Sequence, residues 1–205
     1  MLSVIPYCSR QEDDHSDYQY FDEEMKANTM CWAKWQVQIQ DWRVQLGCLG
    51  MWEVLRPWTS LPNRKYLGIK PGPRILAILD LVTIEILGGA ESTAKLLSEH
   101  PSVYVPKIVT AMEGIIVDVS QNPIRRAFTN NKGISKCMTT SSQLYSYKRD
   151  GLILPREQLY FQGHSRALKF PPKMSQKSIH DLAGVGISLP CLGMIFSSML
   201  VTTGL

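Results

Sequence analysis

Apolar side chains recur at helical spacing in the first part of the chain. Six of them follow one another at steps of three or four residues: Trp32, Trp35, Ile39, Trp42, Leu46 and Leu49. Residues spaced in this way share one face of an α-helix. Four more widen that face: Val37, Val44, Cys48 and Met51. The pattern predicts an amphipathic, tryptophan-rich helix over residues 24–56, which Pro57 ends because proline lacks the N–H that a helix interior requires. We interpret it as a capping helix that packs on the next segment; a partner-binding helix or a coiled-coil seam is the alternative.

A connector and a second helix follow. Residues 57–72 are punctuated by proline and glycine, which is typical of irregular structure. Pro73 suits the first turn of a new helix. The apolar residues behind it occupy nearly every side of that helix: Ile75, Leu76, Leu79, Val82, Ile84 and Ile86. This predicts an inner helix over residues 73–87, which other elements cover on most faces.

Two more helices are predicted between residues 91 and 119. Residues 91–98 form a short helix, and Pro101 marks a turn after it. Residues 104–119 predict a longer helix with one apolar face, made of Val105, Ile108, Ala111, Met112, Ile115 and Val119.

The stretch from Gly88 to Gly133 resembles one armadillo repeat, a helical unit that builds protein-binding scaffolds. The matching positions are Gly89-Ala90, Leu96-Leu97-Ser98, Ala111-Met112, Ser120, Asn122, Arg126 and Gly133-Ile134. The preceding helix resembles the third helix of an earlier repeat, so the resemblance covers about residues 73–137. It implies an all-α fold: a short armadillo-like helical stack, capped by the tryptophan-rich helix and carrying flexible termini. Neighbours must complete the core, because such repeats bury their apolar faces on one another.

Armadillo proteins bind their partners along a groove formed by the third helices. The resemblance therefore implies a non-enzymatic scaffold for a protein partner. It places six candidate contact residues on solvent-facing positions: Asp80, Thr83, Thr110, Glu113, Gly114 and Val117. Peptide-clamping members have Asn on this groove and Trp four residues earlier. Here Asp80 and Gly114 stand at the Asn positions. Leu76 and Thr110 stand at the Trp positions, so we expect a helical or folded partner rather than an extended peptide.

Charge is divided unevenly along the chain, although the net charge is only +4. Residues 1–118 hold 11 Lys and Arg against 15 Asp and Glu, whereas residues 119–205 hold 11 against 3. Residues 1–23 are acidic and polar, which predicts a disordered arm. The candidates for a basic patch are Arg125, Arg126, Lys132 and Lys136. No RNA- or DNA-binding motif surrounds them, so we do not expect a nucleic-acid partner.

The sequence carries no catalytic motif. It has no glycine-rich phosphate loop, no HExxH and no GxSxG, and its four histidines are dispersed. The five cysteines are far apart and none occurs in a CxxC pair. We therefore expect no enzyme activity, no cofactor and no metal. The acidic N-terminal residues resemble neither a secretory signal nor a mitochondrial presequence, which favours a cytoplasmic protein with reduced thiols.

The C-terminal part combines a basic segment with an apolar tail. Residues 138–181 are basic and contain serine and proline; within them Glu157–Gly163 reads EQLYFQG, which resembles the cleavage site of a potyviral protease. Residues 182–205 contain no charge and are long enough to cross a bilayer. Their basic flank is typical of a membrane anchor, but glycine, serine and proline dilute the hydrophobicity, so a tail buried on the helical stack fits equally. The alternative function is thus a membrane-associated structural protein, matrix-like or tail-anchored, that uses the basic segment and Leu182–Leu205.

Overall fold

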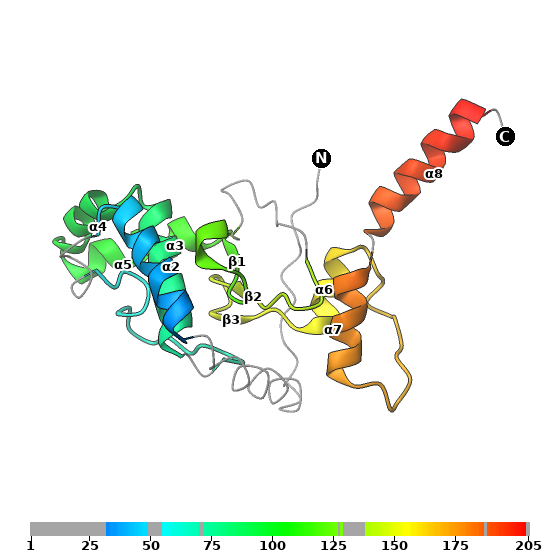
Figure 1. Cartoon of the computed structure of the whole chain (residues 1–205), viewed down its shortest axis with the longest axis horizontal. Helices are drawn as coiled ribbons and strands as arrows, with labels where there is room; N and C mark the ends of the chain where they lie inside the picture. The colour runs from blue at the N-terminus through cyan, green and yellow to red at the C-terminus, as the bar shows by residue number, and fades with distance from the viewer. Residues whose placement is uncertain are drawn as a thin grey trace. The chain divides into compact units, whose positions relative to one another are not determined.

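The computed structural model describes residues 32–48, 55–69, 72–126, 128, 138–186 and 188–203. These residues are mostly helical and include a small antiparallel sheet (Figure 1). The chain divides into two compact units. The helix–sheet unit comprises the described residues of 32–128 and 142–152, and the C-terminal unit comprises the described residues of 138–141 and 153–203. The predicted acidic arm, residues 1–23, lies outside the described residues, as do the predicted helical residues 24–31 and 49–54.

The helices of the helix–sheet unit are α2 (Trp32–Gln45), α3 (Pro73–Ile86), α4 (Ala90–Leu97) and α5 (Pro101–Met112). Proline at the first position of α3 supplies the φ angle that a helix start needs. After α3, Gly88 and Gly89 take φ angles of 91° and 101°, which residues with a side chain rarely adopt. At the start of α5, the imidazole Nδ1 of His100 accepts a hydrogen bond from the Ser102 N–H at 3.3 Å. Helices α3 and α4 therefore lie where the sequence predicts them.

A three-stranded antiparallel sheet corrects the all-α prediction. Its strands are β1 (Ile116–Asp118), β2 (Leu144–Ser146) and β3 (Gly151–Leu152), in the order β1-β2-β3. The helix predicted over residues 104–119 is wrong in its second half, because α5 ends at Met112 and β1 follows. Gly114 favours an end to the helix, and the β-branched residues after it suit a strand. In the described residues, a strand thus stands where the resemblance to an armadillo repeat places the rest of a third helix.

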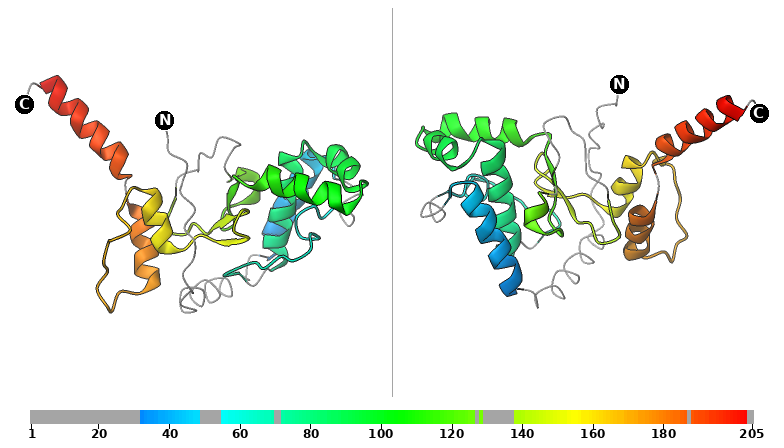
Figure 2. Two further views of the ribbon diagram at one scale, coloured as in Figure 1. Left: turned by 180° about the vertical axis from the view of Figure 1, so that it is seen from behind. Right: turned by 45° about the horizontal axis from the view of Figure 1, so that its top comes forward.

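Helix α3 lies at the centre of the helix–sheet unit. Its residues from Ala77 to Ile84 are all buried, and α2 packs beside it in both views of Figure 2. From α2, Ile39 and Trp42 are buried in this contact, and the Trp42 indole N–H donates to Glu85 of α3 at 2.9 Å. Val37 and Val44, which the pattern adds to the apolar face, are exposed instead. The buried face of α2 is therefore narrower than predicted.

The C-terminal unit contains α6 (Pro155–Phe161), α7 (Gln176–Val185) and α8 (Leu189–Thr203). Helices α6 and α7 pack on each other around Leu159, Ile179 and Ala183. Gly184 fits closely against residues 139–140: a Cβ at this position would lie 2.3 Å from the backbone nitrogen of Thr140. Helix α7 ends where Gly186 takes an extended conformation, and α8 begins three residues later. The predicted basic segment, residues 138–181, is thus largely ordered, since it contributes β2, β3, α6 and part of α7.

Candidate functional site

The six predicted partner contacts do not form one exposed surface. Thr110, Glu113 and Gly114 are exposed, as predicted for a binding face. Asp80, Thr83 and Val117 are instead buried, with exposed fractions of 2%, 0% and 2%. Thr83 donates its hydroxyl to the Leu79 carbonyl oxygen at 2.8 Å, and Val117 belongs to β1. These three positions are therefore corrected from contact residues to core residues.

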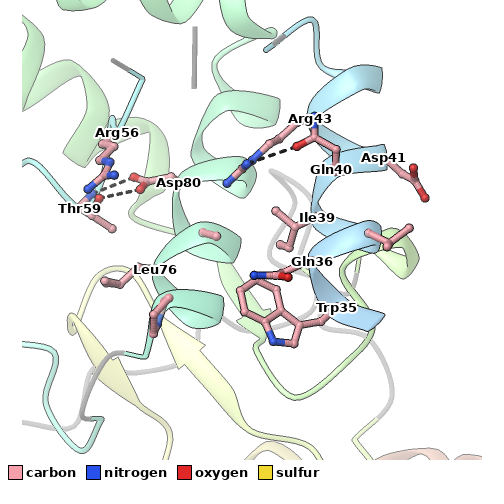
Figure 3. A pocket seen from close by; sticks show the side chains of 13 residues that line it. Trp35, Gln36, Ile39, Gln40, Asp41, Arg43, Arg56, Thr59, Leu76 and Asp80 are labelled. Carbon is pink, nitrogen blue, oxygen red and sulfur yellow. Dashed lines mark hydrogen bonds between the residues drawn. The ribbon is translucent and has the colours of Figure 1, made fainter. Parts of the chain in front are cut away.

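Asp80 is buried because it holds the connector against α3. One carboxylate oxygen accepts from the backbone N–H groups of Trp58 and Thr59, both at 2.9 Å. The other accepts from the Thr59 hydroxyl at 2.6 Å (Figure 3). Burial raises the pKa of Asp80 to about 6, against the effect of these hydrogen bonds, which lower it. The sequence offered one signal for this role, a charged residue within an otherwise apolar helix.

A second buried carboxylate joins the connector to the sheet. Asp150 accepts hydrogen bonds from the backbone N–H groups of Lys65 and Tyr66, and from the Tyr145 hydroxyl. Tyr145 in turn accepts from the indole N–H of Trp58 at 3.3 Å, and burial raises its pKa well above the usual range. Since acid and phenol are bonded to each other inside the core, this network is suited to stabilising the fold. Sequence reasoning missed it, because its members lie up to 92 residues apart.

The predicted basic patch is only partly described. Lys132 and Lys136 lie outside the described residues, and Arg125 is exposed. Arg126 contacts the packed helices: its Nε lies 3.4 Å from a Glu85 carboxylate oxygen, and its Nη2 donates to Gln45 at 3.1 Å. Arg126 thus links the segment after β1 to α3 and α2, in addition to contributing charge.

A cavity of about 800 Å³ lies between α2 and α3 (Figure 3). Trp35, Ile39 and Arg43 line it from α2, and Leu76 and Asp80 line it from α3. Burial lowers the pKa of the Arg43 guanidinium. Among the described residues, no group of three His, Cys, Asp or Glu side chains could hold a metal ion.

Helix α8 presents apolar side chains to solvent on all sides. The large apolar residues that are exposed on it are Leu189, Met194, Ile195, Phe196, Met199, Leu200 and Val201. Val201, for example, keeps 83% of its surface exposed, and no residue of α8 carries a charge. Within the C-terminal unit, residues 189–202 are therefore not buried against α6 or α7.

The base of α8 is tied to the end of α6. The carbonyl oxygen of Gln162 accepts from the Leu189 N–H at 2.8 Å, and its side-chain amide donates to the Ala183 carbonyl oxygen at the end of α7. Gly163, with φ of 88°, lies so close to Pro190 that an added Cβ would stand 2.7 Å from the proline ring. The direction of α8 relative to α6 and α7 is thus set by short contacts at its first turn.

Basic residues are exposed in the same unit. The segment between α6 and α7, together with the first turn of α7, carries Arg166, Lys169, Lys173 and Lys177. It contains no acidic residue between these four cations. The C-terminal unit therefore combines an apolar helix and a basic surface.

Comparisons with protein-family models, with curated proteins and with solved structures find no match to this chain.

Proposed function

We propose that this protein is attached to a membrane through α8. The observation that carries the proposal is the exposure of seven large apolar side chains on a helix without charge. Within the described residues, the stretch Gln176–Thr202, which contains α7 and α8, is the one found to be long and apolar enough to cross a bilayer, and an 18-residue window in it has a mean hydropathy of 1.8. Apolar surface of this extent is unfavourable in water and is typical of a membrane or protein contact.

The distribution of side chains favours insertion over a position flat on the surface. Helices that lie in the bilayer interface have one apolar and one charged face. The polar residues of α8 are hydroxyls, and Thr202 returns its own to the Ser198 carbonyl oxygen at 2.9 Å, which lowers the cost of burying it. The 15 residues of α8 rise about 22 Å, and the uncharged stretch Leu182–Leu205 is 24 residues long.

The transfer of α8 from water into a membrane is favoured by the burial of its exposed apolar side chains. Transfer of each large apolar side chain out of water contributes about 1.5–3 kcal/mol. Because the seven side chains are 43–83% exposed, they contribute roughly 6–13 kcal/mol before the hydroxyls and the loss of freedom are counted.

Flotation with liposomes tests the proposal. We expect the full chain to float with the vesicles and to resist extraction by alkaline carbonate. A chain shortened after Ser188 should stay in the aqueous fraction, as should the full chain with Ile195→Lys and Leu200→Lys. The matched control is Val109→Lys, which changes an exposed valine of α5 and should leave flotation unchanged. Equal behaviour of the full and shortened chains would contradict membrane attachment.

The helix–sheet unit supports a second candidate function, a protein-binding scaffold. The resemblance to an armadillo repeat suggests it, and the succession of α3, α4 and α5 packed on one another is consistent with such a unit. On α5, Val103, Pro106 and Val109 recur every three residues and are all exposed, next to Thr110 and Glu113. We infer that a helical or folded partner would bind this face of α5.

Cross-linking of the purified full chain to candidate partners, with Val103→Asp and Val109→Asp combined, tests the second function. The double variant should lose a partner that the wild type retains, while Lys95→Asp on α4 retains it. Unchanged melting of both variants is required for this comparison. Retention of every partner by the double variant would remove α5 as the binding face.

A further inference from the structure

We propose that residues 164–177, here called the basic loop, form a preformed surface for the headgroups of anionic phospholipids. This inference rests on the proposed membrane attachment and adds the lipid class to it. The loop carries four exposed cations and no acidic residue. The phosphate and carboxylate groups of an anionic leaflet are the complementary charges.

The loop is held in place by its apolar residues. Phe170 and Met174 pack against the α6–α7 core, while Lys169 and Lys173, one residue before each, are exposed. Two hydrogen-bonded turns order the backbone of the loop: the Leu168 N–H donates to the Ser165 carbonyl oxygen at 3.0 Å, and the Met174 N–H donates to the Pro171 carbonyl oxygen at 2.9 Å. Because the backbone is already ordered, little backbone conformational entropy is lost when the lysines meet a surface.

A fifth cation adjoins the loop from α6. The guanidinium of Arg156 lies over the ring of Phe170, 5.4 Å from its centre, and the side chain is exposed. The two acidic residues of this part of the described chain, Glu157 and Asp181, do not pair with the loop cations. Glu157 accepts from the Leu154 N–H at 2.8 Å, and Asp181 is half-buried on α7. Within the described residues, none of the four loop cations has a carboxylate at ion-pair distance, so their charge remains available to a ligand.

The position of α8 favours lipid over another polyanion. The loop begins directly after Gly163, which contacts Pro190 in the first turn of α8. Insertion of α8 would therefore bring the start of the loop, with Arg166, to the level of the headgroups. Leu168 is 42% exposed between Arg166 and Lys169, a pattern that suits the boundary between headgroups and acyl chains. The cations also precede the apolar helix, as they do on the cytoplasmic side of membrane anchors.

The test uses the full chain and two kinds of vesicle, phosphatidylcholine alone and phosphatidylcholine with roughly a third phosphatidylserine. Each neutralised cation near an anionic surface should lower partitioning roughly fivefold. The variant Lys169→Gln/Lys173→Gln should therefore bind anionic vesicles roughly 30-fold more weakly than the wild type and neutral vesicles equally well. The matched control, Lys65→Gln/Lys95→Gln, removes the same charge from exposed residues of the helix–sheet unit and should bind both vesicles as the wild type does.

The outcomes separate this inference from the proposed function. Binding of the wild type to neither vesicle would refute membrane attachment. Equal binding of the wild type to both vesicles, or equal weakening by the loop and control variants, would refute the lipid selectivity and leave attachment intact. If the loop lysines instead control binding to a single-stranded RNA and not to vesicles, the surface is a nucleic-acid site and the inference is overturned.

Discussion

Replacing Asp80 by alanine should destabilise the helix–sheet unit more than replacing it by asparagine. The alanine variant leaves three donors without their acceptor, two backbone N–H groups and the Thr59 hydroxyl. An orphaned buried donor costs about 1–3 kcal/mol, and the two donors of Thr59 are only partly buried. We therefore expect Asp80→Ala to lower the free energy of unfolding by about 3 kcal/mol at pH 4, where the carboxyl of the folded wild type is protonated. Asp80→Asn keeps an acceptor for the N–H groups and should cost about 1 kcal/mol or less at acid pH.

The same carboxyl makes stability depend on pH. Its pKa is about 6 in the folded protein, against 3.8 for an unperturbed aspartate. Because the folded-state pKa is raised, the folded protein binds the proton more tightly than the unfolded chain does. The protonated carboxyl therefore contributes to the free energy of unfolding below pH 4, and this contribution is lost as the pH rises through 6. The difference in pKa corresponds to about 3 kcal/mol. Asparagine does not titrate. The free energy of unfolding of Asp80→Asn, relative to that of the wild type, should therefore rise by about this amount between pH 4 and pH 7.

Urea unfolding of the full chain in a non-ionic detergent measures both effects. Tryptophan fluorescence is a suitable signal, because Trp42 and Trp58 are buried in this unit. Equal destabilisation by alanine and asparagine would show that packing, rather than hydrogen bonding to Asp80, holds the connector. A constant difference between wild type and Asp80→Asn from pH 4 to pH 7 would refute the raised pKa.

Two further predictions concern the C-terminal unit. Gly184→Ala should lower its melting temperature in circular dichroism, because the new Cβ would lie 2.3 Å from the backbone of Thr140. Gly193→Ala meets no atom within 4 Å and should be neutral or stabilising by about 1 kcal/mol; equal effects of the two would contradict the close packing of α7. A potyviral protease should leave the native chain intact and cut between Gln162 and Gly163 only after partial denaturation. Mass spectrometry of the fragments checks this, and rapid cleavage under native conditions would show that the end of α6 opens readily.

The helices with local start and stop signals were predictable from the sequence. Pro73 and the pair Gly88-Gly89 bound α3, and they act within their own turn of the chain. Strand β1 was not predictable in the same way. Ile115 continues the helical spacing of Ile108 and Met112. In contrast, β2, the strand that pairs with β1, lies 26 or more residues further along the chain. A spacing of apolar residues carries no information about such a distant partner, and this partner decides the structure.

The candidate sites show the same contrast between features that depend on local sequence and features that depend on distant contacts. The uncharged tail is a property of composition, so the sequence indicated α8 without reference to other elements. The role of Asp80 depends on two N–H groups some 21 residues away, and the armadillo pattern placed it on a groove instead. The anchoring of the basic loop by Phe170 and Met174 likewise depends on packing against α6 and α7. Charge can be read from the sequence, whereas the surface on which it is displayed comes from the fold.

The stretch Glu157–Gly163 has an explanation in the fold that needs no protease. A protease substrate must be extended in the active site, but here the stretch forms α6 and its end. Glu157 binds the N–H that precedes the helix, and Gln162, only 5% exposed, joins α6 to the end of α7 and the start of α8. Gly163 has a positive φ and no room for a side chain beside Pro190. The residues at both ends of the protease-like pattern thus have structural roles: Glu157 starts α6, and Gln162 and Gly163 position the base of α8.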